Sequence, residues 1–303
     1  MEPSRLGLSL RMIFSENRFT LFRIMRLEYP LMQFVEANGA KIPSIGLGTW
    51  ELRGRTCARI VEQAVKLGYR HFDTAQVYEN EREVGEGIRA SGIKRDDVFV
   101  TTKVWTTHFA PNELERSAKE SLVKLRMPYV DLLLLHWPNP HVPLSETLGA
   151  LAHVKQMELA RHIGVSNFTV ALIEEAVAAC PEPLVCDQVE YHPYLDQAKV
   201  KEACARHHLA LVAYSPVARG RIKNDSTLAR IAERYGKSAA QVCLRWLVQQ
   251  NVCAIPRTSR IERLSENIDI FDFSLDDGEM AAIAGLASPR GRFTDYGFAP
   301  KWD

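Results

Sequence analysis

The sequence predicts a (β/α)8 barrel, the TIM-barrel class of α/β fold, in a chain of 303 residues. Three observations support this prediction. Apolar runs of strand length recur eight times, segments with helical periodicity lie between them, and the runs end in polar or ionisable side chains. The runs are almost continuously apolar, as expected for parallel strands buried on both faces. Eight such strands alternating with helices over roughly 250 residues are typical of this barrel.

The eight apolar runs are each four to seven residues long, which suits a strand. They cover residues 44–49, 71–75, 99–104, 130–136, 162–166, 184–189, 209–214 and 253–256. The segments between them carry apolar residues three and four positions apart, the spacing of one helix face. A doubly wound open sheet is the competing architecture, because a count of strands and helices does not show that the sheet closes.

Additional elements flank the predicted barrel. The Asn38-Gly39 pair between two short apolar segments predicts a type I′ hairpin that caps the bottom of the core. Segments 238–249 and 275–286 predict two extra helices, the second with Ser274 as its N-cap. Residues 291–303 contain Gly, Pro and aromatic side chains without a period, and predict an irregular C-terminal tail over one rim.

Residues 1–31 differ from the rest of the chain because they contain five arginines among Leu, Ile and Phe. An Arg-rich amphipathic beginning is typical of an organelle transit peptide. A non-native leader, or translation from a start upstream of Met32, is the simpler alternative, and we favour it. We therefore expect residues 1–31 to lie outside the fold and residues 32–303 to form a single domain.

Composition argues against several classes of partner. The net charge is +1 with 25% charged residues, so neither nucleic acid nor an anionic membrane is an expected partner. No apolar run is long enough to span a bilayer. The six cysteines form no Cys-x-x-Cys pair, which indicates free thiols in a reducing, cytoplasmic setting and no zinc or dithiol motif.

Side chains at the ends of the predicted strands are the candidate site residues. The C-terminal ends of barrel strands converge on one mouth, where the chemistry of such enzymes lies. The side chains expected there are Trp50, Asp73, Lys103, His136, Ser166, Asn167, Gln188, Tyr214 and Arg257.

Tyr78 is the candidate for acid–base chemistry in this group. It lies five residues after Asp73 and is expected to share the mouth of the barrel with a lysine. A phenol has a pKa of about 10, and a nearby ammonium such as Lys103 is expected to lower it. Asp73 would hold Lys103 in place and His136 would orient a substrate oxygen, which together make a proton donor for carbonyl reduction. The alternative is a buried Asp73–Lys103 salt bridge with Tyr78 as an aromatic at the rim.

Nucleotide-binding motifs give a mixed result. Gly85-x-Gly87-x-x-Ala90 fits a dinucleotide motif but follows a helical segment instead of a strand, so we interpret it as a helix face and exclude a Rossmann site. Residues 257–267 bring three arginines, together with the hydroxyls of Thr258 and Ser259, to a helix start after the eighth run. Helix N-termini and arginines bind phosphate, and barrels often bind phosphate here. A solvated, charged helix start is the alternative.

A metal-dependent hydrolase is a second alternative, since His71, His136, His162 and His192 lie in or near strands. However, His71 lies upstream of its strand end, and the chain has no His-x-His. A three-ligand site would also leave Tyr78 and the arginine cluster unused. We therefore predict no metal.

The motifs resemble those of the aldo-keto reductases, from about residue 34 to the C-terminus. The matching pieces are Gly68 to Glu81, Thr101 to Trp105, Asp131 to Pro138, Ile163 to Phe168, Gln188 to Pro193, Tyr214 to Pro216, and Ile255 to Asn267. The ending, Gly297 to Asp303, is similar to that of bacterial 2,5-diketo-D-gluconate reductases.

The resemblance implies a barrel that binds NADPH without a Rossmann fold. The family's catalytic tetrad falls on Asp73, Tyr78, Lys103 and His136, with Tyr78 as proton donor. Its cofactor contacts fall on Ser166, Asn167, Gln188, Tyr214, Ser215, Arg257, Thr258, Arg263, Glu266 and Asn267. Trp50 and Trp105 match aromatics of the substrate pocket, together with His136. Many members have Lys-Ser where this chain has Arg257-Thr258, and the family's loop after strand seven is short here.

The resemblance therefore implies an NADPH-dependent oxidoreductase that reduces aldehydes, ketones or dicarbonyls, such as methylglyoxal or 2,5-diketo-gluconate, and acts as a monomer. A catalytically idle, NADPH-binding regulatory barrel is the alternative within the same fold. The complete tetrad argues against that alternative.

Overall fold

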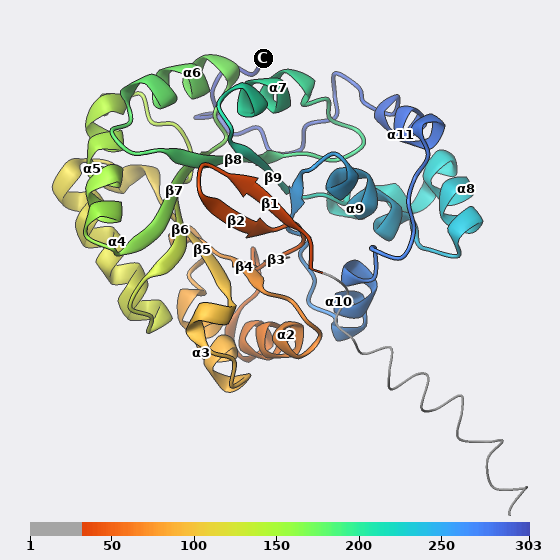
Figure 1. Ribbon diagram of the computed structural model, residues 1–303, viewed down its shortest axis with the longest axis horizontal. Coiled ribbons are helices and arrows are strands. Elements are labelled where there is room, and N and C mark those ends of the chain that lie inside the picture. The colour runs from red at the N-terminus through yellow and green to blue at the C-terminus, as the bar shows by residue number, and fades with distance from the viewer. Residues whose placement is uncertain (1–31) are drawn as a thin grey trace, which may run out of the picture.

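A computed structural model describes residues 32–303 as a closed parallel barrel, and our expectations for residues 1–31 lie outside this range. Strands β3 to β10 follow one another around a single parallel sheet (Figure 1). The first and last strands then meet: the backbone N–H of Gly46 donates to Ala254 O at 2.9 Å, and that of Gly48 donates to Pro256 O at 3.1 Å. This closure confirms the barrel and rejects the open doubly wound sheet.

The barrel strands coincide closely with the predicted apolar runs. They are β3 (Leu47–Gly48), β4 (His71–Asp73), β5 (Phe99–Val104), β6 (Val130–Leu135), β7 (Ala160–Ser166), β8 (Leu184–Glu190), β9 (Ala210–Tyr214) and β10 (Cys253–Ala254). The runs at 44–49 and 253–256 shorten to two residues each, because the first and last strands pair over only a few positions. All residues of β5, β6 and β8 are buried.

Helices surround the strands on the outside of the barrel (Figure 1). They are α2 (Gly54–Lys66), α3 (Glu81–Ala90), α4 (Pro111–Leu125), α5 (Leu144–Gln156), α6 (Val170–Ala179), α7 (Ala198–Arg206), α8 (Ser226–Tyr235), α9 (Ala239–Gln249), α10 (Ile261–Ile268) and α11 (Asp277–Ala284). The predicted extra helices are α9 and α11. The N-cap of α11 is Asp276, so the prediction of Ser274 was wrong. Asp276 and Glu279 form a reciprocal capping box, which satisfies two backbone donors at once.

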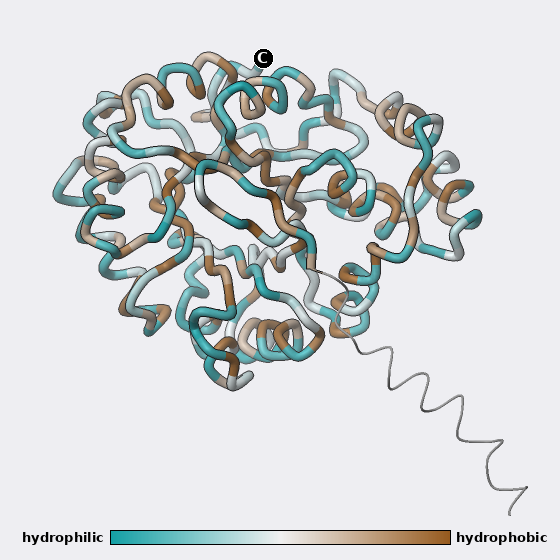
Figure 2. Tube along the Cα trace, viewed as in Figure 1, coloured by the Kyte–Doolittle hydropathy of each residue, from teal (hydrophilic) through white to brown (hydrophobic). Residues whose placement is uncertain are grey.

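The hairpin of β1 (Phe34–Ala37) and β2 (Ala40–Pro43) lies across one end of the barrel (Figure 1). Its turn residues Asn38 and Gly39 have φ of 42° and 88°, as a type I′ turn requires. Side chains facing inward from the hairpin are buried among strand residues, and Figure 2 shows apolar colouring on the strands and on parts of the helices around them. The hairpin therefore closes the barrel opposite the predicted mouth.

The two glycines of the Gly85-x-Gly87 motif face neighbouring helices. A Cβ on Gly85 would lie 2.1 Å from the carbonyl oxygen of Leu125, at the end of α4. A Cβ on Gly87 would lie 2.4 Å from the carbonyl oxygen of Ala58 in α2. The motif lies on a helix face, as we predicted. Helix α3 approaches both neighbours more closely than any side chain allows, so the two glycines serve packing.

Across the described part of the chain, no helix combines the length and apolar character needed to cross a membrane.

Candidate active site

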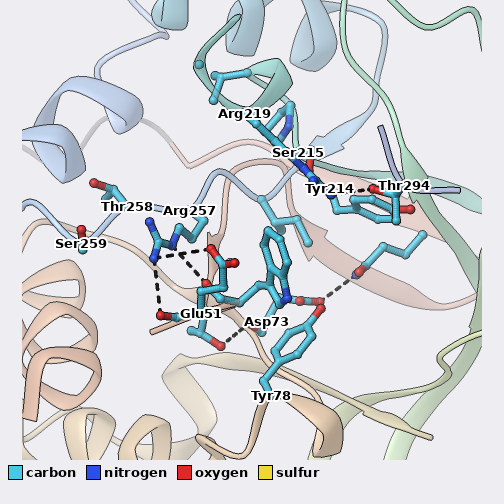
Figure 3. Close-up of a pocket in the computed structure, with 18 of the residues that line it drawn as sticks. Glu51, Asp73, Tyr78, Tyr214, Ser215, Arg219, Arg257, Thr258, Ser259 and Thr294 are labelled. Atoms are coloured by element: carbon cyan, nitrogen blue, oxygen red, sulfur yellow. Dashed lines mark hydrogen bonds and ion pairs between the residues drawn. The ribbon is translucent and has the colours of Figure 1, made fainter. Parts of the chain in front are cut away.

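A cavity of about 1200 Å³ opens at the carboxyl ends of the strands. It is larger than most small-ligand pockets, which span roughly 300–1,000 Å³. This cavity extends toward α10. Leaving His136 and Lys103 aside, fourteen of the predicted residues line it, and Figure 3 shows part of this set. They are Trp50, Asp73, Tyr78, Trp105, Ser166, Asn167, Gln188, Tyr214, Ser215, Arg257, Thr258, Arg263, Glu266 and Asn267. His136 also lines the cavity, whereas Lys103 is fully buried behind it.

Asp73 and Lys103 form a buried ion pair at the ends of β4 and β5. The Lys103 Nζ lies 2.5 Å from Asp73 Oδ1 and also donates to the carbonyl oxygen of Thr74 at 2.9 Å. The other carboxylate oxygen accepts from Gln188 Nε2 at 2.7 Å. Burial lowers the pKa of Lys103, although the Asp73 carboxylate opposes this shift. Both partners are held in one geometry because their remaining polar atoms are hydrogen-bonded.

Tyr78 stands between this pair and the cavity. Its hydroxyl is 3.5 Å from Lys103 Nζ. Burial, with further contributions from Asp73 and Tyr296, raises its pKa well above 10. We expected Lys103 to lower this pKa, and the structure shows the opposite shift. The physical reason is that Asp73 compensates the lysine charge while the phenol loses contact with water. In this state Tyr78 is a protonated phenol, which is a hydrogen-bond and proton donor.

His136 lies beside Tyr78 and Trp105 at the cavity wall. The ring centroids are 5.6 Å and 5.3 Å from those of Tyr78 and Trp105, with edge-to-face geometry in both cases. Burial and the positive charge of Lys103 lower the pKa of His136 well below 6.5. Its Nδ1 is buried without a hydrogen-bond partner. His136 is therefore a neutral imidazole that can hydrogen-bond a ligand oxygen.

Two residues within the motif Gly68 to Glu81, to which no role was assigned, connect the loops of this site. Asn80 donates to the carbonyl oxygens of Thr49 and Leu52 at 2.8 and 3.0 Å, and its own oxygen accepts from the Thr74 hydroxyl at 2.6 Å. Gln76 accepts from the backbone N–H of Trp105 at 3.0 Å. These bonds join the loops that carry Trp50, Tyr78 and Trp105. Their positions were visible in the sequence, but only the fold shows which loops they connect.

The polar residues at the ends of β7, β8 and β9 form a second group along the cavity. Asn167 has a φ of 64°, and its Nδ2 donates to the carbonyl oxygen of His136 at 3.0 Å. Its Oδ1 accepts from the Tyr214 hydroxyl at 2.8 Å. The Ser166 hydroxyl donates to the carbonyl oxygen of Gln188 at 2.7 Å. Polar side-chain atoms thus lie beside Tyr214 along this part of the cavity.

The arginine-rich segment lies at the far end of the same cavity. Helix α10 begins just after Arg260, so its first backbone N–H groups are available to an anion. Arg263 Nη1 pairs with Glu266 Oε1 at 3.0 Å. Arg257 turns toward the opposite wall, where its Nε donates to the carbonyl oxygen of Trp50 at 3.0 Å (Figure 3). The segment therefore fits a phosphate, and Arg257 additionally connects it to the Trp50 loop.

Several further residues line the cavity and were not predicted, among them Arg219, Thr294, Tyr296 and Phe298. Arg219 lies in the 3-10 helix η4 (Ala218–Asn224) after β9. Its Cζ is 5.1 Å from the Trp50 ring centroid, and its Nη2 donates to the Thr294 hydroxyl at 2.9 Å. Tyr296 and Phe298 come from the C-terminal tail. We predicted that this tail covers one rim, but aperiodic sequence does not show which of its side chains reach the cavity.

The His-containing positions of the metal hypothesis do not assemble into a site. Within residues 32–303, no group of three or more His, Cys, Asp or Glu side chains could hold a metal ion. His71 instead lies inside the barrel, with its Nε2 3.2 Å from the Thr101 hydroxyl.

Comparisons with known proteins agree with this geometry. The aldo/keto reductase family model matches residues 44–288. The methylglyoxal reductase DkgB of Escherichia coli O157:H7 is 39% identical over 265 residues, which is 86% of this chain and 99% of that protein. The glyoxal reductase of Bacillus subtilis is 38% identical over 250 residues, 82% of this chain and 90% of that one.

Solved structures give the same result. A crystal structure provisionally named 2,5-diketo-D-gluconic acid reductase B is 49% identical with a TM-score of 0.89, and the match covers 91% of this chain and 99% of that one. A Bombyx mori aldo-keto reductase in complex with NADP is 34% identical with a TM-score of 0.81, covering 89% and 98%. The chain is therefore an oxidoreductase barrel that belongs to the aldo/keto reductase family.

Proposed function

We propose that the protein is an NADPH-dependent reductase of small aldehydes, ketones and dicarbonyls, and that Asp73, Tyr78, Lys103 and His136 carry the reaction. The observation that supports this most directly is the protonated Tyr78 hydroxyl beside the Asp73–Lys103 pair, in the same cavity as a neutral imidazole. The relatives named for methylglyoxal, glyoxal and diketogluconate reduction support dicarbonyls as the substrate class.

The cavity has a suitable group for each part of a dinucleotide. Bound NADPH would supply the hydride for the carbonyl carbon. Tyr214 offers an aromatic face for its nicotinamide ring, and Ser166, Asn167 and Gln188 offer polar atoms for its carboxamide. Ser215 follows toward the pyrophosphate. The 2′-phosphate and adenine would be held by Arg257, Thr258, Arg263, Glu266 and Asn267.

The catalytic side chains would act on the carbonyl oxygen. Tyr78 donates its proton to the oxygen as negative charge develops there, and proton donation by a positioned acid contributes about 10²- to 10⁴-fold to rate. The positive charge of Lys103 stabilises the Tyr78 oxygen once that oxygen has given up its proton. Asp73 keeps the Lys103 ammonium in place. His136 orients the oxygen, while Trp50 and Trp105 exclude water from the pocket.

The pH dependence of reduction follows from two pKa shifts. The pKa of Tyr78 is raised well above 10, so the donor is lost only as the pH rises through that value. The pKa of His136 is lowered well below 6.5, so the imidazole becomes protonated only when the pH falls to this lowered pKa. Single-turnover rates are therefore expected to vary less than about threefold between about pH 6.5 and 9. A steep decline with an apparent pKa near 8 would contradict these assignments.

The preference for NADPH over NADH tests the phosphate end of the cavity. Replacing Arg263 by alanine is expected to raise the dissociation constant of NADPH by about tenfold or more and that of NADH by less than about threefold, because only NADPH carries the 2′-phosphate. Both constants can be measured by fluorescence titration, with Arg234→Ala, a surface arginine on α8, as the matched control. Equal weakening of both cofactors would disprove the phosphate assignment.

The first test of the function is cofactor oxidation in the presence of methylglyoxal and of a 2,5-diketo acid, with NADPH and NADH compared and EDTA added to parallel samples. We expect turnover that favours NADPH and is insensitive to EDTA. Tight NADPH binding without turnover on any carbonyl would favour the regulatory barrel. Loss of activity in EDTA would favour the hydrolase alternative.

The organisation of the protein is part of the same proposal. We propose that residues 32–303 act as one catalytic domain, as a monomer in the cytoplasm. The six free cysteines of the described chain are consistent with a reducing compartment. Size-exclusion chromatography with light scattering would test the monomer.

A further inference from the structure

Glu190 is a fully buried glutamate at the end of β8 that does not line the cavity. Its two carboxylate oxygens accept from consecutive backbone N–H groups, those of Phe293 at 2.9 Å and Thr294 at 2.8 Å. His192 Nε2 lies 3.0 Å from Oε1. Burial opposes ionisation, but the hydrogen bonds from His192 and the two backbone groups lower the pKa of Glu190. A charged group at this depth is stable only because these donors surround it.

The segment held by Glu190 is the beginning of the C-terminal tail. The Phe293 ring stacks on His192 at 4.8 Å between centroids, and Arg221 covers the ring at 4.3 Å. Two residues before Phe293, the backbone at Gly291 passes so close to Tyr194 that a Cβ at this position would lie 1.7 Å from the Tyr194 carbonyl oxygen. Just after Phe293, Thr294 lies beside Tyr214 in the cavity (Figure 3). The tail therefore starts from a single fixed position.

The next residues of the tail form one wall of the cavity. The Phe298 ring lies 5.9 Å from that of Trp105 and 5.4 Å from that of Trp137, both edge to face. Tyr296 stacks on Phe298 at 5.4 Å. Both tail aromatics are nevertheless about half exposed, at 46% and 49%. The C-terminal end is held as well, by Trp302 against Trp137 and by Asp303, which accepts from the Val170 N–H. Between these ends the aromatic segment is held mainly by half-exposed rings, so a firmly anchored start contributes to its position.

We propose that Glu190 is a specificity-determining positioning residue, which anchors the tail through Phe293 and Thr294 and thereby places Tyr296 and Phe298 against the substrate. Glu190 does not line the cavity, so it acts on the substrate through the tail. This inference relies on the proposed function for its kinetic test. It predicts that losing the anchor affects large substrates, whose side groups reach the tail aromatics, more than small ones.

The test compares two dicarbonyls that differ only in their side group, methylglyoxal and phenylglyoxal. Glu190→Gln keeps the shape of the side chain, but its amide nitrogen would face a backbone N–H donor. We expect KM for phenylglyoxal to rise about tenfold, with kcat for both substrates and KM for methylglyoxal within about twofold. NADPH affinity should not change. Hydrogen exchange at the Phe293 and Thr294 amides should accelerate. Glu174→Gln, on the surface of α6, is the matched control.

A double-mutant cycle identifies the route of the effect. If Glu190 acts through the tail aromatics, Glu190→Gln should add nothing to the phenylglyoxal KM of a Tyr296→Ala/Phe298→Ala protein. Gly291→Ala is a second way to displace the tail. The added methyl group clashes with the Tyr194 carbonyl oxygen, and Glu190 itself is unchanged. This variant should reproduce the selective rise in KM, and it keeps the proposal testable if Glu190→Gln does not fold.

Additive effects in the cycle, or an equal loss of kcat for both substrates with unchanged KM, would overturn the inference. Unchanged exchange protection at Phe293 and Thr294 in Glu190→Gln would overturn it without any activity measurement. Wild-type protein that reduces neither dicarbonyl would count against the proposed function instead. The two failures are therefore distinguishable.

Discussion

Replacing Tyr78 by phenylalanine is expected to lower kcat for carbonyl reduction by about 10²- to 10⁴-fold, the usual contribution of a positioned acid. The change removes one oxygen, the atom 3.5 Å from Lys103 Nζ, and keeps the ring that packs edge to face on His136. The dissociation constant of NADPH is expected to stay within about twofold, because the hydroxyl is not among the groups assigned to the cofactor. Stopped-flow kinetics and fluorescence titration measure the two quantities.

Tyr191→Phe is the control for this variant. Tyr191 also loses a hydroxyl with one hydrogen bond, to Gln250 Oε1 at 3.2 Å, but it lies outside the cavity. Its kcat should be close to that of the wild type. If Tyr78→Phe lost cofactor affinity together with turnover, the separation between proton donation and cofactor binding would be wrong.

Replacing Lys103 by methionine is expected to abolish turnover and to lower the free energy of unfolding by about 3–5 kcal/mol. The side chain is fully buried, and its loss leaves the Asp73 carboxylate without its partner at 2.5 Å. Gln188 would still donate one hydrogen bond to that carboxylate, which is not enough to offset a buried charge. Urea denaturation at neutral pH measures the loss of stability.

The double variant Asp73→Asn/Lys103→Met separates the two effects. It removes both charges, so most of the lost stability should return, while turnover should stay absent because Tyr78 has lost its charged neighbour. Recovery of activity together with stability would mean that the pair serves only the fold. That was the alternative interpretation of these residues in the sequence, with Tyr78 as a simple aromatic at the rim.

The barrel and the convergence of its candidate site residues were predictable because strand-length apolar runs record burial directly. The run 99–104 coincides with β5, and the run 130–136 exceeds β6 by one residue. Once the runs are strands of one barrel, Asp73, Lys103 and His136 must share a mouth. No long-range information beyond the fold was needed for this step.

The tail was not predictable in the same way. Its position depends on hydrogen bonds from Phe293 and Thr294 to Glu190, residues about a hundred positions apart. Phe293 and Thr294 belong to no periodic pattern, so the sequence indicates a rim-covering segment without its path. Arg219 escaped prediction for the same reason, since its contacts with Trp50 and Thr294 join three separate loops.

The direction of the Tyr78 pKa shift also required the structure. From sequence, the nearby ammonium was the one visible influence, and it lowers a phenol pKa. Burial and the compensating carboxylate are properties of the assembled site, and they dominate. The N-cap of α11 is a smaller case, because Ser274 and Asp276 are both good caps and only the reciprocal bond with Glu279 distinguishes them.

The close approach at Gly85 and Gly87 limits how far helix α3 can move. Helix α3 is the crossover between β4 and β5, the strands that carry Asp73 and Lys103. Where backbone meets backbone without intervening side chains, the outer wall has little room to yield. The two charges, which lie 2.5 Å apart, are therefore carried by the two strands that this closely packed helix connects. The pattern that resembles a nucleotide fingerprint therefore packs the crossover helix tightly against its neighbours and limits its movement relative to β4 and β5.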